Sequence, residues 1–237
     1  MGSRILLGGL SLICGMAQKP FRPFNLGLGS VFLFGPWQGT NAPFPQKGYL
    51  SGGVGLSIAK EYYTARGNLG VFVFFEGFQL DLASQKLIES LLPEGQRLAE
   101  GYQIPKRTSF LNSGGGGFLL RQRLGAQWAI TLATDLRIVY LSYPDYDVPL
   151  QNGNTFTLIL DSNSFIGMGL RGTLWHHLDP KSANWLGLSL STAWVAGLPA
   201  KYEGILYSPA GKEILFQHQY YFQPQYLALF LHFTFKL

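Results

Sequence analysis

The sequence predicts an all-β fold, an eight-stranded antiparallel transmembrane β-barrel whose strands follow one another as an up-and-down meander. Three observations predict it. Long segments alternate between bulky apolar and small or polar residues, the composition is poor in charge and rich in glycine and aromatic residues, and short connections alternate with long ones. Strands of this kind face lipid on one side and a narrow interior on the other.

The last twelve residues, 226–237, show the alternation most plainly. A spacing of two separates two faces of a strand, whereas a helix would repeat every three to four residues. The same pattern recurs in 49–61, 124–140, 164–175 and 185–195. In the last segment, one face carries Leu227, Leu229, Leu231, Phe233, Phe235 and Leu237, and the other carries Tyr226, Ala228, Phe230, His232, Thr234 and Lys236.

A soluble barrel also alternates, but its bulky apolar residues fill the interior and its charged residues face water. Here the bulky face carries almost no charge, and charged residues make up 13% of the chain where about 25% is ordinary. The bulky face is therefore expected to meet lipid. The expected strands are 24–35, 49–61, 67–79, 108–121, 124–141, 154–175, 184–197 and 224–237.

The connections between these strands support the same topology. The first, third, fifth and seventh are long, at 36–48, 80–107, 142–153 and 198–223, and the others are short. Outer-membrane barrels have long loops outside the cell and short turns in the periplasm. Within the last long connection, residues 204–216 predict a hairpin.

The N-terminus has the features of a secretory signal peptide, with Arg4 before a short apolar run and a cleavage site after Ala17. We expect residues 1–17 to be the signal peptide and 18–237 to be the barrel, in the outer membrane of a Gram-negative bacterium. The net charge of +5 is spread along the chain, which argues against nucleic acid as a partner.

On this pattern, and on a terminal strand with Phe233 and Phe235 in alternation, the chain resembles the OmpA/OmpX-like superfamily of outer-membrane barrels. The resemblance is closest to the stand-alone barrels of Bacteroidota and covers 18–237. It implies the barrel architecture and contact with outer-membrane lipid. It implies no particular activity and no cofactor.

Charged residues on the small, inward face are the first candidate site. Buried charges must be compensated, so we expect these residues to pair with one another in a lumen charge network. Small inward residues such as Gly167, Gly169 and Ser189 leave open the alternative of a polar pocket. The network residues are Glu61, Arg171, His232 and Lys236 toward the periplasm and Glu76, Asp135 and Arg137 toward the outside.

The long loops are the second candidate site. Residues 82–95 predict a short amphipathic helix that ends at Pro93. Its apolar stripe either folds onto the barrel mouth or forms a docking surface for a partner, together with an aromatic stretch near residue 221. The residues of this candidate loop partner surface are Leu87, Ile88, Leu91, Leu92, Tyr220, Tyr221 and Phe222.

No motif predicts catalysis, a cofactor or a metal site. A lipid hydrolase at the outer leaflet needs a nucleophile beside a histidine base. His176 and His177 fall on the periplasmic side, and no motif surrounds Ser208 and His218. We therefore expect a non-enzymatic barrel that acts as a structural or accessory subunit of an outer-membrane assembly through its long extracellular loops. The alternatives are a small-ligand or lipid-binding barrel that uses its lumen, and an outer-leaflet lipid hydrolase.

Overall fold

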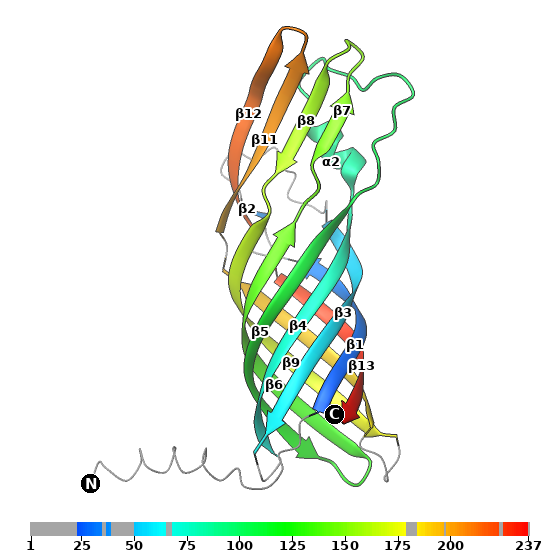
Figure 1. Ribbon diagram of the computed structural model, residues 1–237, viewed down its shortest axis with the longest axis vertical. Helices are drawn as coiled ribbons and strands as arrows, with labels where there is room; N and C mark the ends of the chain where they lie inside the picture. The colour runs from blue at the N-terminus through cyan, green and yellow to red at the C-terminus, as the bar shows by residue number, and fades with distance from the viewer. Residues whose placement is uncertain are drawn as a thin grey trace, which may run out of the picture.

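The computed structural model describes residues 23–34, 37–38, 50–64, 68–178, 184–196, 198–222 and 225–236. A long barrel continues at one end into a second, smaller sheet (Figure 1). The expected signal peptide, residues 1–17, lies outside the described residues and stays a prediction.

Eight antiparallel strands close the barrel, as the sequence predicts. Their order is β1-β13-β10-β9-β6-β5-β4-β3, and β1 pairs with both β13 and β3, so no edge is left open. Each strand neighbours the barrel strand that precedes and follows it in the chain. The strands are β1 (Pro23–Phe34), β3 (Leu50–Tyr63), β4 (Leu69–Leu82), β5 (Thr108–Arg123), β6 (Trp128–Ser142), β9 (Asn163–His177), β10 (Trp185–Val195) and β13 (Gln225–Lys236).

The outer wall of the barrel is apolar and exposed. Ile166, Phe118 and Leu136 are 68%, 71% and 64% exposed, while the residues beside them along each strand are turned inward. Leucine, isoleucine and phenylalanine at such exposure are unfavourable in water, and a band of them around a closed barrel is the surface that a bilayer covers. The chain is an outer-membrane type of barrel.

A second sheet extends the barrel on the side of the long connections. Together with helix α2 (Ser84–Leu91), it forms what we call the outer module (Figure 1). Among the described residues, no helix is long and apolar enough to span a bilayer. The sheet has the order β2-β12-β11-β8-β7, formed by β2 (Trp37–Gln38), β7 (Tyr146–Pro149), β8 (Thr155–Leu160), β11 (Leu198–Ser208) and β12 (Gly211–Phe222).

The predicted hairpin within 204–216 is present and longer than expected, because β11 and β12 pair along their whole length. Its turn ends at Gly211, whose φ of +129° favours glycine. The single strand expected over 154–175 is wrong. It is two strands in different sheets, β8 and β9, separated at Asp161, whose backbone N–H donates to the carbonyl of Lys201 in β11.

One apolar core joins the upper barrel to the outer module. It begins inside the barrel at Phe78 and Phe230, continues through Leu141 and Phe165 near the mouth, and ends beneath α2 at Ile88. All five side chains are at most 1% exposed. The barrel mouth is therefore closed by the chain's own side chains.

Candidate functional site

The middle of the barrel interior holds a network of buried charges centred on Arg137. Its guanidinium donates to both carboxylate oxygens of Asp135, from Nε to Oδ1 and from Nη2 to Oδ2, each at 2.6 Å. Its Nη1 lies 3.3 Å from Oε2 of Glu76 on β4, which is separated from β6 by β5 alone. The two-pronged contact with Asp135, on the same strand, is a strong charge-assisted pair that orients the guanidinium. The contact with Glu76 links β6 to β4 across the inner face of β5.

The carboxylate of Glu76 accepts hydrogen bonds from the other donors of this network. Arg171 donates from Nη2 to its Oε1, and the hydroxyls of Ser113 and Tyr226 lie 3.2 and 3.3 Å from its Oε2. Arg137 also donates to the hydroxyl of Tyr226. Arg171 was expected near the periplasmic end, away from Glu76, but its long side chain joins the outer group of charges.

A second network lies nearer the periplasmic end. The carboxylate of Glu61 accepts from Nδ2 of Asn25 at 2.7 Å and from the hydroxyl of Tyr63 at 2.5 Å. Arg121 lies close by, with its guanidinium 4.7 Å from the ring centre of Trp185 and 5.8 Å from that of Tyr63. The buried charged residues of the described part are three carboxylates and three guanidinium groups, so the interior charge is balanced.

His232, which was expected in the charge network, makes no hydrogen bond within it. His232 is 2% exposed and packs beside the rings of Trp175 and Phe230, and neither of its ring nitrogens has a hydrogen-bond partner. The side chain of Lys236 lies outside the described residues. Sequence reasoning missed Arg121, Tyr63, Asn25, Ser113 and Tyr226, since polar residues on an inward face give no pairing signal by themselves.

The small inward residues do not leave a pocket in the lumen. A Cβ added to Gly169 would lie 2.1 Å from the guanidinium of Arg137, and one added to Gly187 would lie 2.4 Å from the ring of Trp175. Glycine is therefore present because a neighbouring large side chain occupies the space. A cavity of about 10 Å³ remains between Glu61, Arg171 and His232, and this is room for about one water molecule.

Helix α2 folds onto the mouth of the barrel. Leu87, Ile88 and Leu91 are 1%, 0% and 4% exposed, and Leu92 packs against the same core. The expected docking stripe is therefore wrong for the helix, because the chain itself covers these side chains. The hydroxyl of Ser84 at the start of the helix lies 2.6 Å from that of Tyr146 in β7, and burial raises the pKa of Tyr146.

The other half of the expected loop surface lies in β12. Tyr220, Tyr221 and Phe222 form the end of this strand that lies nearest the barrel, and their side chains lie outside the described residues. Within the part of the chain that the structure describes, β12 pairs with β11 on one side and with β2 on the other only at Tyr221 and Phe222. Among the described residues, the rest of β12, from Gly211 to Gln219, pairs with no strand on this side, and we call it the open edge of β12.

His218, the histidine considered for catalysis on the outer side, does not lie beside Ser208. Ser208 pairs with Gly211 at the hairpin tip and its hydroxyl bonds within the turn, whereas His218 pairs with Tyr202 and packs on its ring. Six residues of strand separate the two positions, which is about 20 Å. Within the described ranges, no group of histidine, cysteine and carboxylate side chains could hold a metal ion.

Comparisons with known proteins give distant similarities to outer-membrane proteins. No family model and no curated protein matches the chain. Among solved structures, Neisserial surface protein A has a TM-score of 0.48 at 10% identity, over 91% of this chain and 97% of that one. A major outer-membrane protein from Thermus thermophilus has 0.49 at 12%, over 91% and 99%. OprG from Pseudomonas aeruginosa has 0.47 at 11%, over 91% and 96%. Identities this low and scores below 0.5 assign no activity or partner.

Proposed function

We propose that this chain is a non-enzymatic accessory subunit of the bacterial outer membrane, which holds the outer module at the cell surface for a protein partner. The observation that carries the proposal is the closed interior. A charge network fills the middle of the lumen, an apolar core fills it from there to the mouth, and α2 covers the end. Neither a path for solutes nor a chamber for a ligand remains among the described residues.

The open edge of β12 is the feature that a partner would use. An exposed strand edge offers a row of backbone N–H and C=O groups to another strand. The side chains there are a mixture of Lys212, Glu213, Ile214 and Gln217, and Ile214 is 56% exposed. A partner strand would gain backbone hydrogen bonds along this edge and an apolar contact at Ile214.

The proposal is tested with a shortened hairpin. Ile205 and Ile214 face each other across β11 and β12, so residues 206–213 can be replaced by an Asn-Gly turn, which joins paired strands directly. The barrel and α2 are unchanged in this variant. Native mass spectrometry of the protein extracted in mild detergent from its own outer membrane then compares the variant with the intact chain.

We expect the intact chain to carry a protein partner at fixed stoichiometry and the shortened hairpin, which lacks Gly211, Lys212 and Glu213 of the edge, to retain much less of it. Leu136→Ala on the lipid-facing wall serves as the matched control and should keep the partner. An intact chain that is recovered alone, or a partner that stays bound after the hairpin is shortened, would contradict the proposal.

A further inference from the structure

A groove runs along the lipid-facing wall of the barrel, outside the lumen and below the outer module. Its volume is about 490 Å³, which lies within the range of about 300–1,000 Å³ common for small-molecule sites. It crosses β1, β3, β4 and β5. Its lining combines the apolar side chains of Leu28, Val54, Leu56 and Phe110, the carboxamides of Gln79 and Asn112, and a floor at Gly77.

The hollow exists because β4 has a glycine where its neighbours carry side chains. Gly77 lies between Leu56 of β3 and Asn112 of β5 in one row across the sheet. A Cβ at this position would meet the Oδ1 of Asn112 at 3.1 Å and the ring of Phe75 at 3.5 Å, so a larger side chain would project into the groove. The apolar part of the groove has the shape for a hydrocarbon chain.

The two carboxamides distinguish this groove from the rest of the lipid-facing wall. Gln79 and Asn112 lie diagonally across the β4 and β5 pair. Within the described part of the chain, neither side chain makes a hydrogen bond to another residue. A polar group turned toward hydrocarbon without a partner is unfavourable, so the occupant should bring hydrogen-bonding groups to this depth. The ester or amide linkages of a lipid do so.

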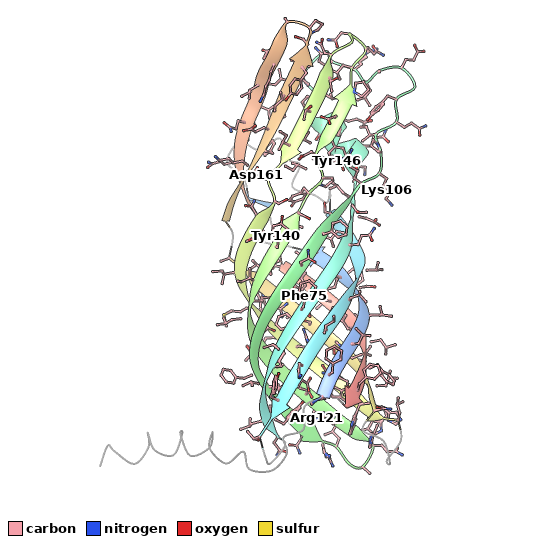
Figure 2. All side chains as sticks on the ribbon, viewed as in Figure 1. Phe75, Lys106, Arg121, Tyr140, Tyr146 and Asp161 are labelled. Atoms are coloured by element: carbon pink, nitrogen blue, oxygen red, sulfur yellow. The ribbon has the colours of Figure 1, made fainter. Side chains whose placement is uncertain are left out.

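The depth of the amides agrees with that of lipid linkages. Asn112 faces Tyr140 across β5 and β6, and exposed tyrosines near strand ends mark the membrane interface. Phe75, Tyr140 and Lys106 lie at successive heights along the wall in Figure 2, with Lys106 nearest the outer module. The groove therefore runs from the apolar region to the headgroup level of the outer leaflet.

The ammonium group of Lys106 lies on the side of the carboxamides that is nearer the outer module (Figure 2). Asp81 follows Gln79 on the same face of β4, about 7 Å farther along the strand, and its carboxylate lies 3.6 Å from Nζ of Lys106. The side chains of Lys106 and Asp81 are 73% and 60% exposed, so the pair is open to solvent and headgroups. An ammonium has three donors, and one contact with Asp81 leaves others for a phosphate.

We propose that this groove is a binding site for one phosphorylated, acylated lipid of the outer leaflet. Its acyl chain lies over Gly77 between Leu56 and Phe110, its ester or amide carbonyls accept hydrogen bonds from the carboxamide NH2 groups of Gln79 and Asn112, and its phosphate meets Lys106. The site is on the outside of the barrel and is independent of the open edge of β12.

The test uses the full-length barrel in detergent and two probes, phosphatidylglycerol and a diacylglycerol with the same acyl chains, followed by native mass spectrometry. We expect one phosphatidylglycerol to be retained per barrel and the diacylglycerol, which lacks the phosphate that meets Lys106, to be retained about two- to fivefold less strongly. Gly77→Leu fills the groove with an apolar side chain that suits the lipid-facing wall, and should lower retention of phosphatidylglycerol by about tenfold or more.

Gly172→Leu is the matched control. It is also a glycine of a barrel strand, on β9, where an added Cβ would contact only Leu132 at 3.8 Å. This variant should bind as the unchanged chain does, and Lys106→Ala should weaken binding by about two- to fivefold, the effect of one exposed charge. Equal retention in Gly77→Leu and Gly172→Leu, or equal retention of the two probes, would show only unspecific lipid around the barrel and overturn the proposal.

Discussion

The barrel and the outer module bury opposite kinds of side chain. In the lower and middle barrel, the interior holds charged and polar side chains and the exterior is apolar, as at Arg137 and Leu136 on neighbouring positions of β6. In the outer module, Ile88 and Tyr202 are fully buried, while Lys212 and Glu213 face outward. The two regions share one continuous apolar core, so both burial patterns occur within a single folded unit.

The difference shows what each environment demands. Lipid stabilises an apolar exterior, so the barrel wall needs no polar surface, and its narrow interior is held by paired charges. The outer module is surrounded by water and depends on apolar burial, as soluble proteins do. The same type of substitution should therefore have different consequences in the two regions.

The largest effect is expected from Arg137→Ala in the barrel interior. Removing the cation leaves Asp135 and Glu76 buried with one fewer partner, and breaking a buried pair in this way costs about 3–5 kcal/mol. Urea unfolding in detergent, followed by tryptophan fluorescence, measures the loss. Arg97→Ala in a loop of the outer module is the control and should leave the free energy of unfolding unchanged. An unaltered midpoint for Arg137→Ala would mean that the network does not stabilise the barrel.

A large but local effect is expected from Ile88→Ala in α2. Truncation of a fully buried isoleucine costs about 2–5 kcal/mol, and here the loss falls on the helix and the sheet beneath it. Limited proteolysis should cut the outer module faster, while the urea midpoint of the barrel shifts less than in Arg137→Ala. Lys86→Ala on the exposed side of the same helix is the control. Equal protease resistance of both variants would argue against the shared core.

Two matched substitutions separate the outer surfaces of the two regions. Leu136→Arg places a charge on the lipid-facing wall and should cost about 2–4 kcal/mol near the bilayer centre. Ile214→Arg, at a comparable exposure of 56% on β12, should change the free energy of unfolding by no more than about 0.5 kcal/mol, because water already surrounds it. Urea unfolding in lipid vesicles gives both values. Similar costs at the two positions would place both in the same environment.

The smallest effect is expected from alkaline pH on the outer module. Burial raises the pKa of Tyr202 from 10.0 to about 12. Since the folded state holds this proton more tightly than the unfolded state, the contribution to stability is fully present below pH 10 and is lost as the pH rises toward 12. Hydrogen exchange of β11 should therefore accelerate over this interval, and Tyr202→Phe should reduce the acceleration. An identical pH response of the two proteins would exclude Tyr202 as its source.

The sequence predicts the barrel well because its period of two does not depend on long-range contacts. The last strand, with Leu229 outward and Phe230 inward, reads correctly without any neighbour. The break at Asp161 was missed although four polar residues, 161–164, mark it, because the even positions are apolar on both sides and the two strands were joined into one. Arg121 was missed because the glycine run of β5 has few side chains from which to assign a face.

The candidate site, too, could be predicted from the sequence only in part. Pairing among Glu76, Asp135 and Arg137 follows from the need to compensate buried charge, which the residue types reveal. The filling of the lumen could not be predicted from the residue types. Whether the space beside Gly169 is empty depends on which side chain of a neighbouring strand extends into it. The side chain is that of Arg137, two strand positions and one neighbouring strand away.

The position of α2 in the chain determines when its apolar stripe can be buried during folding. The helix lies between β4 and β5, whereas β7, β8 and β11, which complete the core around Ile88, come later in the chain. The apolar stripe of α2 cannot be buried until β7, β8 and β11 have folded against it. Contacts between segments far apart in sequence form slowly. Burial of this stripe is therefore a late step in folding, because it depends on segments that lie more than fifty residues farther along the chain.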